Sequence, residues 1–175
     1  MTDLLDFCRV KKIDEKGFGF LKSLYYPYDI FFHFSQIKKD EFRDKLNDMK
    51  RGEFFLYFLS KEVDGRKRKV KQIWYSLKDV PEEYYSSFFD RIIVEFQIGR
   101  TNLFDLLYAY KEIKELNLLT DELTEKILTA NRILKLPTTI IPYLTTEEIV
   151  LFKKLLNYDQ LKISDNKPFW FDDIP

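Results

Sequence analysis

Two aromatic stretches decide the fold of the first part of this chain: Lys16-Gly17-Phe18-Gly19-Phe20 and, further along, Ile30-Phe31-Phe32-His33-Phe34. Both are typical of strands, in which side chains at every second position point to the same face. Phe18 and Phe20 are expected on one face, and Phe31 and His33 share one face of the next strand. If the two strands pair, four flat rings become neighbours on one surface. Gly17 and Gly19 would keep that surface uncrowded, so that another backbone or a ligand could approach closely.

Further short strands flank these two stretches. Apolar residues and turn signals predict a short helix over 40–50 and strands over 5–13, 18–22, 29–34, 53–63 and 66–75. Asp64-Gly65 is a typical two-residue hairpin turn between the last two strands. Five short strands with a longer connection after the third are the inventory of an OB-type Greek-key barrel. We therefore expect an all-β barrel of this type over residues 1–77.

From residue 78 onward the apolar residues recur at helical spacing. About four helices are predicted, over 81–98, 103–117, 120–134 and 145–156. Thr145 to Glu148 form a capping box at the start of the last one. The tail carries Phe169-Trp170-Phe171, which could dock on its own chain or offer rings to a partner. The second predicted domain is therefore α-helical and covers residues 78–175.

The formal net charge of zero conceals two oppositely charged parts. Residues 1–77 contain 17 Lys and Arg against 12 Asp and Glu, a charge of +5, and residues 78–175 contain 12 against 17, a charge of −5. The basic part also holds the aromatic strands. A polyanion would therefore be attracted to the first part of the chain only.

Several classes of protein are excluded by what the sequence lacks. Cys8 is the only cysteine and His33 the only histidine, which argues against an internal disulfide and a Cys/His zinc site. No stretch approaches the roughly 18 apolar residues of a membrane span, and the chain does not start like a signal peptide. No catalytic triad, P-loop or distinct carboxylate set stands out. We expect a soluble cytoplasmic protein that binds no membrane, needs no cofactor and is not an enzyme.

The two aromatic stretches, in this order and within five strands, resemble the cold-shock domain from Arg9 to Trp74. The first nucleic-acid motif of that family is matched by residues 16–20, and the second by residues 30–34 followed by Ser35. The resemblance implies an OB barrel that binds single-stranded RNA or DNA, with bases stacked along the aromatic face. It implies a basic contact at Lys16 and stacking positions at Phe18, Phe20, Phe31, His33, Phe34 and Phe42.

The first strand departs from the family. Members usually have Lys-Trp-Phe-Asn before the glycine motif, whereas this chain has Lys11-Lys12-Ile13-Asp14 and is one residue shorter. Lys12 therefore replaces a stacking tryptophan. We expect weaker base stacking and a steeper salt dependence than in a typical member.

The fifth strand departs as well, because Arg66-Lys67-Arg68-Lys69 stands where the family tends to carry small and amide residues. This basic run could follow a phosphate backbone. It could equally be a solvated hairpin whose charges prevent edge-to-edge pairing. Both interpretations stay open from the sequence.

The fourth strand is apolar on both faces. Aligned to the family, Phe55, Tyr57 and Leu59 are expected to point inward. Large apolar side chains on the outer face then need a cover, which we expect the helical domain to supply at roughly 1.5–3 kcal/mol per buried side chain. The interdomain contacts would be made by Phe54, Leu56 and Phe58.

Together these features predict a protein that binds single-stranded nucleic acid, RNA in the first instance. Stacking contributes roughly 1–3 kcal/mol per base, and the bases would lie on Phe18, Phe20, Phe31, His33 and Phe42. Phosphates would be neutralised by Lys12, Lys16 and the run 66–69. The alternative is a protein-interaction module whose aromatic face is covered by the helical half or the tail. The helical half could also bind a protein partner of its own.

Overall fold

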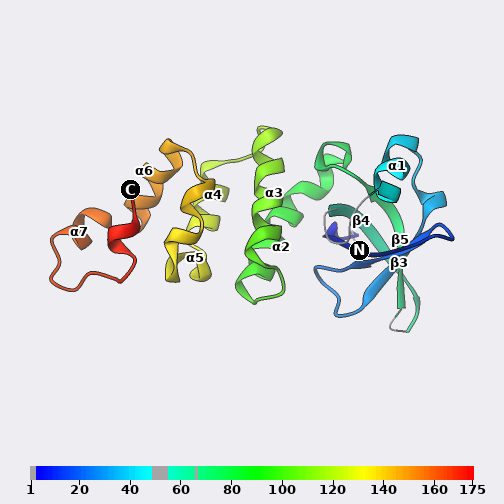
Figure 1. Cartoon of the computed structure of the whole chain (residues 1–175), viewed down its shortest axis with the longest axis horizontal. Coiled ribbons are helices and arrows are strands. Elements are labelled where there is room, and N and C mark those ends of the chain that lie inside the picture. The colour runs from blue at the N-terminus through cyan, green and yellow to red at the C-terminus, as the bar shows by residue number, and fades with distance from the viewer. Residues whose placement is uncertain (1–2, 49–54, 66) are drawn as a thin grey trace. The chain divides into compact units, whose positions relative to one another are not determined.

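The computed structural model describes residues 3–48, 55–65 and 67–175. The chain divides into two compact units, Met1–Leu116 and Asn117–Pro175 (Figure 1). The first unit contains a β-barrel and two long helices, and the second is helical throughout its ordered elements. The boundary predicted from composition, at residue 77, lies where strands give way to helices. The compact units divide later, because the next two helices belong with the barrel.

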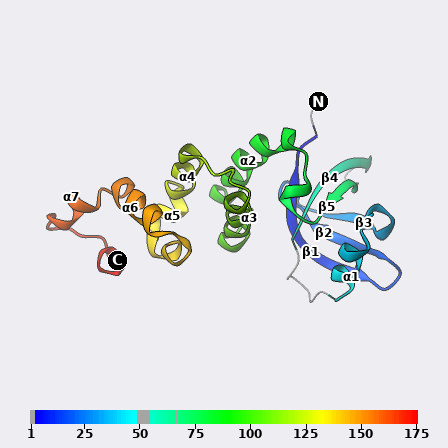
Figure 2. The ribbon, with the colours of Figure 1, turned by 90° about the horizontal axis from the view of Figure 1, so that it is seen from above.

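The first unit contains a closed barrel of five strands, as predicted (Figure 2). Around the barrel the strands follow the order β1-β2-β3-β5-β4, and β4 pairs back with β1. β3 and β5 pair in parallel, and the other neighbours are antiparallel. The connection from β3 to β4 carries the short 3₁₀ turn η1 (Phe34–Gln36) and the helix α1 (Asp40–Asp48). The strands are β1 (Asp6–Asp14), β2 (Phe18–Lys22), β3 (Asp29–His33), β4 (Phe55–Asp64) and β5 (Lys67–Trp74).

The barrel core is built from every second residue of the strands, and Gly19 is part of it. A Cβ atom at Gly19 would lie 2.6 Å from the Phe32 ring and 2.6 Å from the Lys12 carbonyl oxygen. The glycine therefore makes room for a core ring and not for a ligand on the outer surface. Gly17, with φ of 89°, turns the chain between β1 and β2. The core includes Cys8, Val10, Leu21, Ile30, Phe32, Leu56, Phe58 and Val70.

The faces of β4 are the reverse of those expected. Leu56 and Phe58 lie fully buried in the barrel core, whereas Phe55 and Tyr57 point outward and contact the helices. Phe54 lies outside the described residues. Because apolar residues occupy both faces of β4, the sequence does not show which face points into the barrel. The predicted inward-facing residues are off by one position, and this error interchanges the inner and outer side chains.

The expected helical cover of β4 is present, although it contacts the other face. It consists of α2 (Tyr85–Gln97) and α3 (Leu103–Glu115). The Tyr108 ring stacks on Phe55 with 4.1 Å between the centroids, and Phe88 meets Tyr57 edge to face at 5.6 Å. Phe7 of β1 joins the same cluster, 5.9 Å from Phe88. The short 3₁₀ turns η2 (Leu77–Asp79) and η3 (Glu82–Tyr84) lead from the barrel into α2.

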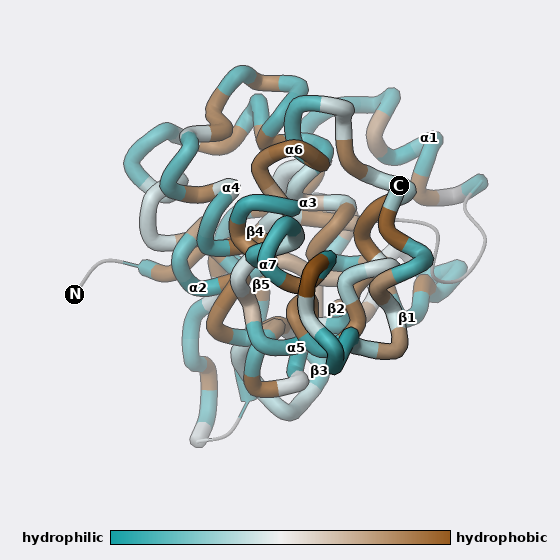
Figure 3. Tube along the Cα trace, turned by 90° about the vertical axis from the view of Figure 1, so that its left-hand side faces the viewer, coloured by the Kyte–Doolittle hydropathy of each residue, from teal (hydrophilic) through white to brown (hydrophobic). Residues whose placement is uncertain are grey.

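The second unit is made of short helices and turns. The helix predicted over 120–134 is divided at Thr129 and Ala130, because the Ala130 backbone leaves the helical region and the Thr129 hydroxyl bonds back to the Glu125 carbonyl. The predicted capping box of Thr145 and Glu148 is present. Figure 3 shows polar and apolar residues alternating within the helices. The elements are α4 (Asp121–Leu128), α5 (Asn131–Lys135), η4 (Pro137–Thr139), η5 (Ile141–Tyr143), α6 (Thr146–Leu155), α7 (Tyr158–Lys162) and η6 (Phe171–Asp173).

The aromatic tail docks within the second unit. Trp170 and Phe171 are buried together with Ile174, and the Phe171 ring stacks on Tyr158 at 4.8 Å. Phe169 is 82% exposed. Of the three tail rings, two are therefore already used in the packing of this unit. None of the helices in the described ranges is long and apolar enough to cross a membrane.

Candidate nucleic-acid interface

The predicted cluster of rings on β2 and β3 is present. The strands pair with Phe18 opposite His33 and Phe20 opposite Phe31. The centroids of the three phenylalanine rings lie 5.6 Å (Phe18 to Phe31), 5.8 Å (Phe20 to Phe31) and 6.1 Å (Phe18 to Phe20) apart. Phe31 is 37% exposed, His33 is exposed, and Phe18 and Phe20 are half-buried. The four rings therefore form one aromatic cluster on the outer surface of the barrel.

Lysines flank the aromatic cluster on both sides. On β1, Lys12 pairs with Phe20. On β5, Lys69 pairs with Phe31, and Lys61 of β4 pairs with Lys69. Neighbouring positions across the five strands therefore form one row, in which two rings lie between lysines. In barrel order the row is Lys12, Phe20, Phe31, Lys69 and Lys61. Among the described residues, neither Lys12 nor Lys69 has a side-chain ion pair, so their charges are available to an anion.

His33 has a structural task at the end of β3. Its Nδ1 accepts a hydrogen bond from the Ser35 backbone N–H at 3.0 Å, and its own backbone N–H donates to the Gln36 side chain at 2.9 Å. These bonds form a capping box for η1 and fix the imidazole position. Because Nδ1 accepts, the neutral ring carries its proton on Nε2.

Two rings that the resemblance implied lie elsewhere. Phe42 is only 6% exposed and belongs to the barrel core, with its ring 5.5 Å from Tyr75. Phe34 is half-buried and stacks on the core ring of Phe32 at 6.0 Å. The structure therefore brings Phe18, Phe20, Phe31 and His33 together and assigns Phe42 to core packing.

The basic run of residues 66–69 contains both exposed side chains and one that is engaged in contacts. Lys67 and Lys69 are exposed, and Arg66 lies outside the described residues. Arg68 is half-buried: its Nε donates to Ser60 Oγ at 2.9 Å, and its guanidinium lies 4.2 Å from the centre of the Tyr26 ring. Arg68 thus links β5 to Ser60 of β4 and to Tyr26 of the loop between β2 and β3, and its guanidinium is already engaged. Lys16 is exposed in the turn between β1 and β2.

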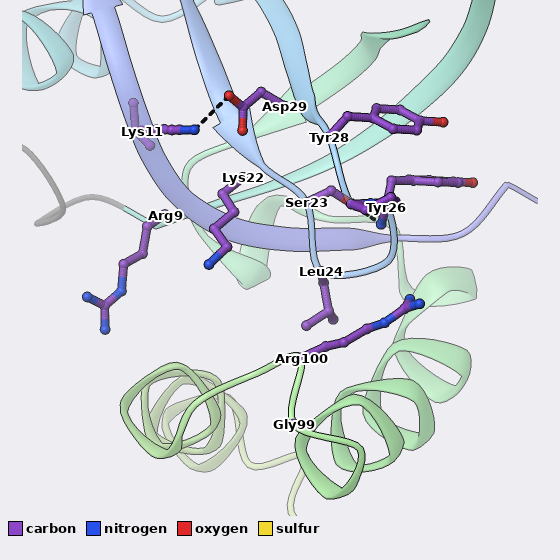
Figure 4. Close-up of a pocket in the computed structure, with 12 residues that line it drawn as sticks. Arg9, Lys11, Lys22, Ser23, Leu24, Tyr26, Tyr28, Asp29, Gly99 and Arg100 are labelled. Carbon is purple, nitrogen blue, oxygen red and sulfur yellow. Dashed lines mark hydrogen bonds and ion pairs between the residues drawn. The ribbon is translucent and has the colours of Figure 1, made fainter. Parts of the chain in front are cut away.

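A cleft that the sequence did not predict lies on the same strands as the aromatic cluster, although none of the four rings lines it. It has a volume of about 610 Å³ and lies between the outer sides of β1 and β2, the loop 23–28 and the turn between α2 and α3 (Figure 4). The Tyr-Pro-Tyr composition of the loop was visible in the sequence. Arg100 comes from the α2–α3 turn, which only folding brings to the barrel. The lining includes Arg9, Lys11, Lys22, Tyr26, Tyr28, Asp29 and Arg100.

Asp6 anchors the loop that forms one wall of this cleft. Its Oδ1 accepts the backbone N–H groups of Phe7 and Leu24, each at 2.8 Å, and its Oδ2 accepts the Ser23 hydroxyl. Ser23 Oγ in turn accepts the N–H groups of Tyr25 and Tyr26. Burial raises the pKa of Asp6 to about 7, although the hydrogen bonds lower it. The Tyr25 hydroxyl also donates to the Leu5 carbonyl at 2.7 Å. The buried carboxyl group of Asp6 and this bond therefore tie the loop to the start of β1.

The chain matches no protein-family model, no curated protein and no solved structure. The use of the barrel surface must therefore be inferred from its own residues.

Proposed function

We propose that this protein binds single-stranded nucleic acid, RNA in the first instance, on the aromatic cluster of Phe18, Phe20, Phe31 and His33. The observation that carries the proposal is the row of exposed or half-buried rings between Lys12 and Lys69, neither of which has an ion pair among the described residues. Bases have flat faces that stack on such rings, and phosphates need cations at their sides. A purely structural cluster would gain nothing from the two lysines beside it, which form no ion pair in the described part of the chain.

We also propose that the barrel is of the OB type and related to the cold-shock domain. The strand order, the parallel pairing of β3 with β5 and the helix in the connection from β3 to β4 support this. In such barrels the face of the second and third strands binds oligonucleotides. The aromatic cluster lies on that face.

The alternative, a protein-interaction module with a covered aromatic face, has less support. Within the first unit, α2 and α3 pack on Phe7, Phe55 and Tyr57, which leaves Phe31 and His33 exposed.

Replacing two rings tests the proposal. In the double variant Phe20→Ala/Phe31→Ala, labelled single-stranded oligonucleotide should bind about 30-fold more weakly or worse, because two stacked bases lose roughly 1–3 kcal/mol each. Fluorescence anisotropy at low salt measures this affinity.

The matched control is Phe104→Ala on α3, which removes a phenylalanine that is 64% exposed in the same unit. It should leave the affinity unchanged. Equal affinity of the double variant and the native chain, with both folded by circular dichroism, would refute the stacking proposal.

A further inference from the structure

The cleft near the aromatic cluster has a volume of about 610 Å³ and no role in the ring site proposed above. A smaller cavity of about 280 Å³ shares six lining residues with the 610 Å³ cleft, so both lie between the strands and the α2–α3 turn. Cavities of this size hold small organic ligands. Both cavities are lined by Arg9, Lys22, Ser23, Leu24, Gly99 and Arg100.

Cations outnumber carboxylates around the two cavities. Their linings have four cations, Arg9, Lys11, Lys22 and Arg100, and two carboxylates, Asp29 and Asp105. The remaining excess of positive charge favours an anion.

The four cations differ in how far they are engaged. The Arg9 Nε bonds to Asp105 at 2.9 Å, and Lys11 bonds to Asp29 at 2.9 Å. The Arg100 Nη1 donates to the Tyr25 carbonyl oxygen at 2.7 Å, and its Nε lies 3.7 Å from Oε2 of the buried Glu95. Lys22 has no ion pair within the part of the chain that the structure describes. Lys22 is therefore the side chain best placed to receive an added anion.

The cleft continues the aromatic cluster along the same strands. Lys22 follows Phe20 by two residues on β2, and Asp29 precedes Phe31 by two on β3, so each pair shares a face. Lys22 and Asp29 are also opposite each other in the register. A step of two strand residues is about 7 Å. A nucleic-acid strand leaving the rings would reach the cleft with its next nucleotide.

The cleft also offers aromatic surface. The rings of Tyr26 and Tyr28 stack at 5.8 Å, and Arg68 lies over Tyr26. Figure 4 shows Lys22 reaching from β2 toward the α2–α3 turn, and Arg100 reaching from that turn beneath the loop that carries Tyr26. Cations and flat rings in one hollow match the phosphate and base of a nucleotide.

We propose that this cleft holds the nucleotides that follow those on the aromatic cluster, with phosphate at Lys22 and Arg100 and a base beside Tyr28. The inference rests on the proposed function and extends it. It makes the α2–α3 turn part of the nucleic-acid site, so the first unit binds as a whole and the barrel does not bind alone.

The test compares Lys22→Ala with the native chain on two oligouridylates, one of about four and one of about eight nucleotides, within the usual range for such barrels. For the longer oligonucleotide the variant should bind about fivefold more weakly at low salt. The slope of log K against log salt should be smaller by about 0.7, the value for one lost phosphate contact on a single strand. The shorter one, held by the rings, should bind with unchanged affinity.

Each other outcome is decisive. If the variant and the native chain bound both lengths equally, the proposed role of the cleft would be refuted, whereas the proposed binding to the rings would not be. If Lys22→Ala weakened the binding of both lengths equally, Lys22 would belong to the ring site, and the proposed role of the cleft would again be refuted. If the native chain bound neither length, both the proposed function and this inference would fail. Lys135→Ala, an exposed lysine of the second unit, is the matched control and should behave as the native chain.

Discussion

Gly19 shows how a single position serves the core of the barrel while its neighbours serve the surface. Phe18 and Phe20 on either side point outward to the aromatic cluster, and Gly19 itself lies against the ring of Phe32. The sequence suggested that the glycine keeps the outer surface open. The alternation of a strand puts it on the inner face instead.

A methyl group at this position should destabilise the barrel. Gly19→Ala is expected to lower the free energy of unfolding by about 1–3 kcal/mol, because backbone and ring must both shift to admit the Cβ atom. Chemical denaturation measures the loss.

The double variant Gly19→Ala/Phe32→Leu provides the control for this explanation. If the clash with the ring is the cause, the two changes together should cost less than the sum of the single changes. Additive losses would assign the effect of Gly19→Ala to the Lys12 carbonyl alone.

At the scale of elements, the loop between β2 and β3 is held by a buried acid. Asp6 of β1 accepts hydrogen bonds from Ser23 and Leu24, and this loop carries the tyrosines of the cleft. Burial raises the pKa of Asp6 from 3.8 to about 7. A raised pKa of an acid means that the folded chain holds a proton which the unfolded chain releases.

This linkage predicts a specific pH dependence. The contribution of Asp6 to stability is fully present below pH 3.8 and is lost as the pH rises through about 7. Across that window the native chain should lose about 1.4 kcal/mol per pH unit relative to Asp6→Asn, which cannot ionise. Urea denaturation of both chains between pH 5 and pH 8 measures the difference. A constant difference across this range would show that the hydrogen bonds keep Asp6 ionised.

At the scale of the whole molecule, the barrel and the helices α2 and α3 form one folding unit. Phe7 and Tyr57 lie on the outside of the barrel and are fully buried, because Phe88 and Tyr108 cover them. Each such side chain contributes roughly 1.5–3 kcal/mol when buried. The barrel therefore depends on residues beyond its last strand.

Two fragments test this dependence. A fragment of residues 1–116 should unfold cooperatively and retain nucleic-acid binding. A fragment of residues 1–77 should be unfolded or aggregated, because it exposes a contiguous apolar patch. Thermal melting followed by circular dichroism compares them. If the shorter fragment melted as the longer one does, the boundary at residue 77 would be the correct folding boundary.

The sequence by itself determined the strands of the barrel, their turns and the pairing of aromatic residues on β2 and β3. These features depend on local alternation and on turn residues such as Gly17 and Asp64-Gly65, which act over a few positions. The rings of Phe18, Phe20 and Phe31 were therefore predictable as neighbours.

Only the tertiary structure decided three other features. It placed Leu56 and Phe58 in the core. The apolar sequence of β4 does not determine which face is buried, whereas the register of β4 with β1 and β5 does. It buried Phe42 in the barrel core. It also brought Arg100 to the loop between β2 and β3, where its Nη1 donates to the Tyr25 carbonyl oxygen. This is a contact between residues far apart in the chain, which no local pattern encodes.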